Sequence, residues 1–209
     1  MNLVYLHGFQ SSKNSIKGQL LKKYLAQFPE ITVHLPDLNA PPKQVIAELS
    51  ALIESLDQVV LVGSSLGGFY ATQLMAHYQI PTVLINPAIR PWQLFRALFA
   101  EVTLPYRVNA TWSLDDAQLD DMQTLAVTQI AQPELLLVLL QQGDETLDYR
   151  EAQQFYSAAQ AGTALVMTDI GGNHGMDDFA EKIPMVMQFL TDAVKNRSSQ
   201  HIKNANKKE

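Results

Sequence analysis

The sequence contains no cysteine, no long apolar run and only a modest share of basic residues. The absence of cysteine excludes disulfides, thiolate metal ligands and a cysteine nucleophile. The formal net charge of the 209 residues is −6, which argues against nucleic-acid binding because that binding depends on basic patches. The last fifteen residues, from Lys195 to Glu209, hold five Lys or Arg and one acidic residue, so the acidic excess lies in the rest of the chain.

No stretch approaches the roughly 20 consecutive apolar residues that a helix needs to cross a bilayer. The most apolar run, Leu135 to Leu140, has the length of a buried strand. The N-terminus has neither a basic region nor a signal-type apolar stretch, since residues 3–6 already have the pattern of a strand. We therefore expect a cytoplasmic protein that does not insert into membranes.

Short apolar strands alternate with amphipathic helices along the chain. The apolar runs with strand character are residues 3–6, 31–35, 59–62, 82–85, 135–140 and 164–167. This alternation predicts an α/β fold with a mainly parallel sheet of about six strands, flanked by helices.

The sequence indicates one domain over residues 1–194, followed by a tail. At about residues 88–133 the alternation breaks, and two helical patterns there predict a small helical cap inserted into the domain. The last helix is expected at residues 183–194, with Pro184 in its first turn. The polar and basic tail, residues 195–209, lacks a core pattern and is expected to be disordered.

A Gly-x-Ser-x-Gly pattern at residues 63–67 follows the strand at 59–62 and precedes a helical segment. In the context strand, sharp turn, helix, the central serine adopts strained torsions and its hydroxyl stands clear of both elements. Glycine is needed on both sides because a Cβ would collide where strand and helix pass closely. Ser65 is therefore a candidate nucleophile, and a purely structural glycine-rich turn is the alternative.

A serine nucleophile needs a base, and the base needs an orienting partner. His174 lies in the glycine-rich loop 171–175, directly after the last predicted strand. In a parallel sheet this loop lies at the carboxyl edge, the same edge that presents Ser65. The remaining histidines are expected to be structural or to lie in the tail: His7, which is expected to shape the loop after the first strand, His34, His77 and His201.

The loop after the strand at 135–140 offers three acidic residues as the orienting partner. Asp144 follows the strand most closely and ranks first. Asp148 directly precedes a helix and is equally well explained as its N-cap, while Glu145 ranks behind both. The order Ser, Asp, His along the chain is the one that a strand-turn-helix nucleophile of this kind requires.

Ester hydrolysis also requires hydrogen-bond donors for the developing oxyanion. The backbone N–H of Leu66 is one candidate, because it opens the helix after Ser65 and has no acceptor within that helix. The backbone N–H of Phe9, after His7-Gly8, is the second.

These residues resemble the α/β-hydrolase superfamily and, more closely, its small bacterial YqiA-like esterases. The segments that carry the resemblance are Tyr5-Leu6-His7-Gly8-Phe9, Gly63-Ser64-Ser65-Leu66-Gly67-Gly68, Leu84-Ile85-Asn86-Pro87-Ala88, Gly143-Asp144-Glu145 and Gly171-Gly172-Asn173-His174. The resemblance implies a compact esterase that acts on acyl esters and acyl-CoA thioesters, with Ser65, Asp144 and His174 as its triad.

We therefore expect a serine hydrolase that cleaves small-molecule acyl esters or thioesters through an acyl-enzyme and needs neither a metal nor an organic cofactor. Trp92, Phe95 and Phe99 are candidates for lining an acyl pocket, and packing of the cap explains them equally well. Arg90 is a weaker candidate for contacting an anionic group such as a CoA phosphate. Two alternatives remain open: a non-catalytic ligand-binding protein of the same fold, and a transacylase with the same triad. The sequence specifies neither the acyl chain length nor the oligomeric state.

Overall fold

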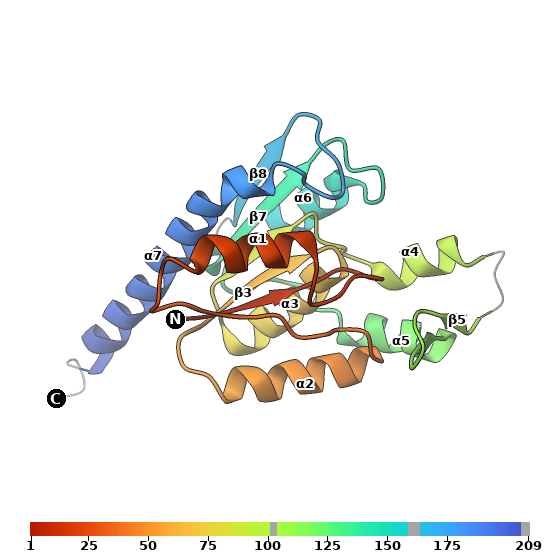
Figure 1. Ribbon diagram of the computed structural model, residues 1–209, viewed down its shortest axis with the longest axis horizontal. Coiled ribbons are helices and arrows are strands. Elements are labelled where there is room, and N and C mark those ends of the chain that lie inside the picture. Colours follow the sequence, from red (N-terminus) through yellow and green to blue (C-terminus); the bar gives the residue numbers. More distant parts are fainter. Residues whose placement is uncertain (101–103, 159–163, 206–209) are drawn as a thin grey trace.

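The computed structural model describes residues 1–100, 104–158 and 164–205. Its centre is a six-stranded parallel sheet (Figure 1), in which the strand order is β2-β1-β3-β4-β7-β8. The strands are β1 (Asn2–Leu6), β2 (Thr32–His34), β3 (Val59–Ser64), β4 (Thr82–Ile85), β7 (Leu136–Gln141) and β8 (Leu165–Asp169). The predicted fold class, an α/β fold with a mainly parallel sheet of about six strands, is confirmed.

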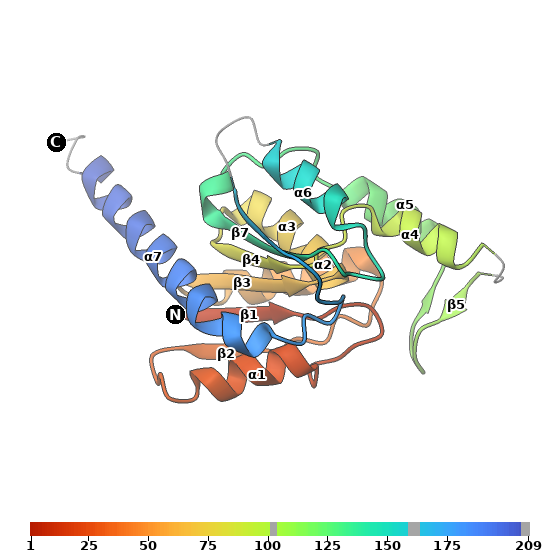
Figure 2. The same ribbon diagram turned by 90° about the horizontal axis from the view of Figure 1, so that it is seen from above.

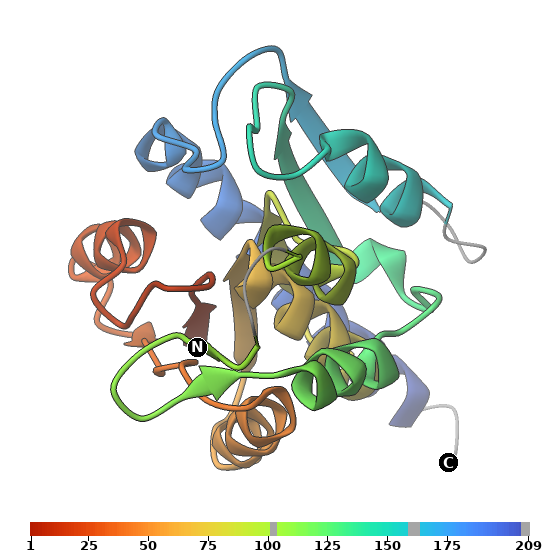
Figure 3. The ribbon, with the colours of Figure 1, turned by 90° about the vertical axis from the view of Figure 1, so that its right-hand side faces the viewer.

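Helices cover both faces of this sheet (Figures 2 and 3). One face is covered by α1 (Ile16–Leu25) and α7 (Phe179–Ala205), the other by α2 (Pro42–Glu54), α3 (Leu66–Tyr78) and α6 (Tyr149–Ser157). Successive side chains of a strand point to opposite faces. Accordingly Leu3 of β1 is buried on the α1 and α7 side, and Val4 is buried on the α2 and α3 side. Burial on both faces explains why the four inner strands β1, β3, β4 and β7 are almost continuously apolar, whereas the edge strands β2 and β8 are only partly buried.

Residues 88–133 form an insertion between β4 and β7, which we call the cap. It contains α4 (Pro91–Leu98), the antiparallel pair β5 (Tyr106–Arg107) and β6 (Ser113–Leu114), and α5 (Asp116–Leu125); the short helix η1 (Pro133–Leu135) leads into β7. The strands of the sheet point toward α4, β5 and α5 in Figure 2, so the cap stands at the carboxyl edge. Both helices were predicted, but the hairpin was not, because two-residue strands leave no alternating pattern. Residues 101–103 of the cap lie outside the described residues.

The last helix is longer at both ends than the sequence pattern indicates. It begins at Phe179, whose side chain is fully buried against the sheet, so Pro184 lies inside the helix and not in its first turn. At the other end, residues 195–205 continue the helix where a disordered tail was expected, and α7 projects beyond the sheet in Figure 1. Residues 206–209 lie outside the described residues. None of the helices in the described part of the chain is both long and apolar enough to cross a membrane.

Candidate active site

Ser65 occupies the turn between the end of β3 and the start of α3. Its φ of 55° and ψ of −121° lie in a region that non-glycine residues rarely adopt, so the turn is strained. Glycine on either side allows the elements to approach one another. A Cβ on Gly67 would lie 2.1 Å from the carbonyl oxygen of Leu6, and a Cβ on Gly63 would lie 2.5 Å from that of Gly67. The close approach that the sequence predicts around the serine is therefore present.

A chain of hydrogen bonds joins Ser65, His174 and Asp144. The Oγ of Ser65 lies 2.9 Å from Nε2 of His174, and Nδ1 of the same ring lies 2.8 Å from Oδ2 of Asp144. The Asp144 side chain is 2% exposed, and its Oδ1 accepts the backbone N–H groups of Thr146 and Leu147. The carboxylate is thus fixed in orientation, and it in turn fixes the imidazole ring.

The two alternative acidic residues have other contacts. The side chain of Asp148 accepts the backbone N–H of Arg150 and caps the start of α6. Glu145 does not contact the His174 ring through a hydrogen bond; its Oε2 accepts the backbone N–H of His174 at 2.9 Å. This hydrogen bond lowers the pKa of Glu145. The geometry therefore agrees with the ranking of Asp144 as the partner of the ring.

The loop after β1 lies against Ser65, where the sequence places the oxyanion donors. A Cβ on Gly8 would come within 3.1 Å of the Ser65 Cβ, and the next residue, Phe9, lines the same cavity as Ser65. Leu66 is the first residue of α3, so its N–H has no acceptor within the helix. The roles of Phe9 and Leu66 as donors stay predictions that this arrangement permits.

His7 holds the loop in place through both ring nitrogens. Its Nε2 accepts the backbone N–H of Leu38 at 3.0 Å, which puts the ring proton on Nδ1, and Nδ1 donates to the carbonyl of Gly8 at 2.8 Å. Burial of the ring lowers the pKa of His7 and favours this neutral form. These two hydrogen bonds are the contacts expected of a residue that shapes the loop after β1.

A cavity of about 660 Å³ opens onto Ser65 and His174. It lies between residues 8–17, which connect β1 to α1, and residues 174–177, which follow His174. We call it the Ser65 cavity. Its other side chains include the apolar Tyr5, Phe9, Leu20 and Met176 and the polar Gln10, Ser11, Ser12, Asn14, Ser15, Lys17 and Asp177.

Two of the proposed substrate contacts line a different cavity. Arg90 and Trp92 border a cavity of about 590 Å³ between the cap and α6. The Arg90 guanidinium forms an ion pair with Glu151, and Trp92 packs edge-on against Phe69 at a centroid distance of 6.3 Å. The structure does not bring Arg90 or Trp92 to the Ser65 cavity. Sequence reasoning had no signal for the ion pair, because its partners lie far apart in the chain.

Phe95 packs against Phe9, which lines the Ser65 cavity. The two rings lie 4.6 Å apart between centroids, and Phe95 itself is buried. They belong to an aromatic cluster that joins the loop after β1 to the cap: Phe9, Phe95, Phe99, Tyr106 and Trp112. The cluster therefore supports the wall of the cavity to which Phe9 belongs.

Asn86 and Gln141, which the sequence analysis did not single out, hold the loop of His174. Asn86 is buried with a φ of 40°, and its Nδ2 donates to the carbonyls of Asn173 and His174 at 3.1 and 3.2 Å. Its Oδ1 accepts the N–H of Gln141, whose own Oε1 accepts the N–H of Asn173. The carboxyl ends of β4 and β7 thus position the His174 loop. The sequence contains a signal for both residues, because each is a polar residue directly after an apolar run with strand character.

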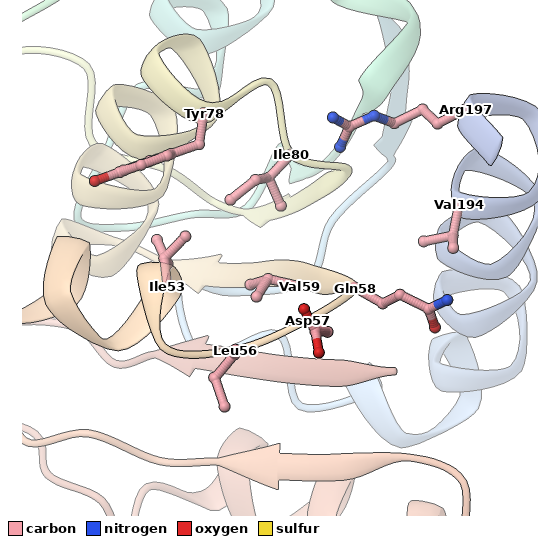
Figure 4. A pocket seen from close by; sticks show the side chains of 9 residues that line it. All are labelled: Ile53, Leu56, Asp57, Gln58, Val59, Tyr78, Ile80, Val194 and Arg197. Carbon is pink, nitrogen blue, oxygen red and sulfur yellow. The ribbon is translucent and has the colours of Figure 1, made fainter. Parts of the chain in front are cut away.

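A further cavity of about 680 Å³ lies at the opposite edge of the sheet (Figure 4). It is bordered by Ile53 of α2, by Leu56 just after that helix, by Val59 at the start of β3 and by Arg197 of α7. The length of β3, about 16 Å at 3.3 Å per residue, separates it from Ser65. This cavity is therefore not part of the candidate active site.

The parallel sheet, the serine at a strained strand-to-helix turn and the histidine loop at the carboxyl edge define the α/β-hydrolase fold. The expected resemblance to this superfamily is confirmed. The chain belongs to the family described as uncharacterised protein family UPF0227, whose sequence model matches residues 2–191.

Several solved structures share this fold at low sequence identity. Est1E from Butyrivibrio proteoclasticus, solved with bound ferulic acid, is 14% identical with a TM-score of 0.70, over 93% of this chain and 89% of that chain. The α/β hydrolase domain-containing protein 10 from mouse is 15% identical with a TM-score of 0.70, over 90% of both chains. A monoglyceride lipase from Saccharomyces cerevisiae is 13% identical with a TM-score of 0.67, over 92% and 87%. At these identities the likeness concerns the fold.

Proposed function

We propose that this protein is a serine hydrolase that cleaves carboxylic esters or acyl thioesters through an acyl-enzyme. The observation that carries the proposal is the continuous hydrogen-bonded chain from Ser65 through His174 to the buried carboxylate of Asp144. An isolated serine hydroxyl is a weak nucleophile, and this arrangement is the one that activates it.

In the acylation step, Ser65 Oγ attacks the carbonyl carbon of the ester and forms a new C–O bond. Its proton passes to Nε2 of His174, 2.9 Å away, and the carbonyl oxygen becomes an oxyanion. The backbone N–H groups of Phe9 and Leu66 are the proposed donors to that oxyanion. His174 then gives the proton to the leaving alkoxide or thiolate as its bond to the carbonyl carbon breaks.

In the deacylation step, a water molecule attacks the carbonyl carbon of the acyl-enzyme. His174 takes the proton of the water and returns it to Ser65 Oγ when the ester bond to the enzyme breaks. The products are a carboxylic acid and the regenerated serine. Throughout both steps Asp144 accepts from Nδ1, which keeps Nε2 free to receive a proton and stabilises the imidazolium.

The names of the fold relatives support an ester as the substrate class. Est1E was solved with ferulic acid, and the yeast relative is named a monoglyceride lipase. The proposed chemistry needs only groups of this chain, so it requires neither a metal nor an organic cofactor.

Hydrolysis of p-nitrophenyl butyrate by the wild type and two serine variants tests the proposal. We expect Ser65→Ala to lower kcat by at least about a thousandfold, since removal of a triad nucleophile leaves only binding and the oxyanion donors. Ser64→Ala is the matched control, because Ser64 lines the same cavity but Ser65 is the serine that is hydrogen-bonded to His174, so this variant should keep ester hydrolysis. Full hydrolysis by Ser65→Ala refutes the nucleophile assignment.

The same assays test the two alternative functions. If the wild type hydrolyses none of the esters and thioesters, a ligand-binding protein is favoured. If the acyl group passes to an added alcohol in preference to water, a transacylase is favoured.

A further inference from the structure

Lys17 is the only basic residue among the described residues that line the Ser65 cavity, apart from His174. It is the second residue of α1, and its side chain is half-buried. Its Nζ donates to the carbonyl oxygen of Gly175, the residue directly after His174. A fixed cationic group therefore stands in the cavity that contains the proposed nucleophile and base.

This ammonium group has no carboxylate partner in the described part of the chain. By comparison, Lys43 forms an ion pair with Asp121, and Lys182 forms one with Asp169. Lys17 forms only the bond to Gly175, which uses one of the three donors of an ammonium group. Burial lowers the pKa of Lys17, while the more distant carboxylates of Asp177 and Asp144 act in the opposite direction. A half-buried cation of this kind is stabilised by an anion that enters the cavity.

The side chains around Lys17 suit a polar ligand group. Ser11, Ser12 and Asn14 line the same end of the cavity, on the loop that leads into α1. Asp177 is the acidic residue among the described residues that line this cavity, and its Oδ2 already accepts the side-chain amide of Asn173 at 2.8 Å. The apolar side chains of Phe9, Leu20 and Met176 also line the cavity.

We propose that Lys17 binds an anionic oxygen group of the substrate, a carboxylate or a phosphate, at the end of the Ser65 cavity formed by residues 10–17. The inference rests on the proposed function and narrows its substrate class. The preferred substrates are esters or thioesters that carry a negative charge at a distance from the scissile carbonyl. A carboxylate on the acyl chain and a phosphate on the leaving group are the two sources of that charge.

Kinetics with matched substrates distinguish these sources. The first pair is mono-p-nitrophenyl adipate and p-nitrophenyl hexanoate, which have acyl chains of equal length and differ in the terminal carboxylate. The second pair is butyryl-CoA and the neutral thioester S-butyryl-N-acetylcysteamine. We expect the wild type to prefer the charged member of one pair by about tenfold or more in kcat/KM, the scale of a charge-assisted hydrogen bond.

Three variants of the loop and helix show whether Lys17 is responsible. Lys17→Met removes the charge and leaves an unbranched side chain only one atom shorter. It should raise KM for the charged substrate about tenfold while kcat/KM for the neutral one stays within about twofold. Lys17→Arg should restore the preference. Lys13→Met is the control, because Lys13 is exposed on the same loop and does not line the cavity.

An equal loss of kcat for both members of a pair would show that Lys17 only tethers the His174 loop through Gly175, and would overturn the proposal. An unchanged preference in Lys17→Met would overturn it as well. Calorimetric titration with adipate and with coenzyme A, which carry the two sources of charge, separates this inference from the proposed function, because it needs no turnover. The comparison is between Ser65→Ala and the double variant that also carries Lys17→Met. An affinity for one of the two anions that is about tenfold weaker in the double variant supports the anion site. An equal affinity of the two proteins for both anions contradicts it, whether or not any ester is hydrolysed.

Discussion

The proton positions around His174 follow from the contacts of its two ring nitrogens. Asp144 can only accept while it is ionised, so Nδ1 of the ring carries the proton and Nε2 is free to accept from Ser65 Oγ. The backbone of His174 is held as well, at its N–H by Glu145 and at its carbonyl by Asn86. These contacts therefore fix both the tautomer and the position of the ring that we propose as the base.

The choice of Asp144 as the orienting carboxylate leads to a direct prediction. Asp144→Asn replaces the carboxylate opposite Nδ1 of His174 by an amide. An amide that donates to Nδ1 favours the tautomer with the proton on Nε2, which cannot accept the Ser65 proton, so kcat should fall by about 10⁴-fold. Asp148→Asn makes the same chemical change four residues later, where asparagine still caps α6, and should leave kcat within about twofold and stability nearly unchanged. Steady-state kinetics of the two variants check this. A larger loss in Asp148→Asn would reverse the assignment.

The neutral state of His7 predicts a pH dependence of folding stability. Its pKa in the folded protein lies below the unfolded value of about 6.5, so between these two values the unfolded chain binds more protons. Its contribution is therefore fully present above about pH 6.5 and is lost as the pH falls toward the folded pKa. Urea unfolding of the wild type and His7→Gln at pH 7 and pH 5 measures it.

We expect the wild type to lose more stability than His7→Gln between these two pH values. Glutamine does not titrate, and its side-chain oxygen is an acceptor suited to the N–H of Leu38. Equal losses in the two proteins would mean that His7 does not titrate differently in the folded and unfolded chains.

At the scale of elements, the approach of α3 to β1 and β3 determines where Ser65 stands. The Cβ of Gly67→Ala would overlap the carbonyl of Leu6, a backbone group that cannot rotate away. We expect a loss of at least about 3 kcal/mol in the free energy of unfolding, the upper part of the usual range for overpacking, and a lower kcat in the protein that still folds. Chemical denaturation and ester hydrolysis measure both. A variant with unchanged stability and kcat would show that the backbone adapts and that the close contact does not position the serine.

The sequence predicts those elements whose signals are local. The strand before Ser65, the helical segment after it and the loop of His174 each follow from residues that are neighbours in the chain. The hairpin of β5 and β6 and the full length of α7 lack such a signal, because two-residue strands show no period and the polar end of α7 has no apolar face to recognise.

Contacts between distant residues account for the rest of what the sequence could not predict. The bonds from Asn86 to the His174 loop and from Lys17 to Gly175 join residues that lie far apart in the chain. The ion pair of Arg90 with Glu151 likewise becomes visible only in the folded protein. These contacts help to decide which polar residues face the Ser65 cavity, and for this reason the sequence wrongly placed Arg90 and Trp92 at that cavity.

At the scale of the whole molecule, α7 supplies buried side chains to the core from Phe179 to Leu190, and Val194 packs against them. Ala193 is buried as well, so this contribution extends just past the middle of the helix. We expect a chain that ends at Arg197 to keep its free energy of unfolding within about 0.5 kcal/mol and to keep its kcat, whereas Leu190→Ala should cost about 2–5 kcal/mol. Thermal and chemical unfolding compare the two. Unfolding of the shortened chain would assign a structural role to the end of α7.

The most direct test of the central claim is covalent labelling of the intact protein by a fluorophosphonate, followed by peptide mass spectrometry. We predict one adduct per chain, on Ser65, and its loss in Ser65→Ala. The same label should persist in Ser64→Ala and slow strongly in His174→Ala, because the ring accepts the Ser65 proton. A protein that remains unlabelled, or is labelled at the same rate without His174, would contradict the account of Ser65 as an activated nucleophile.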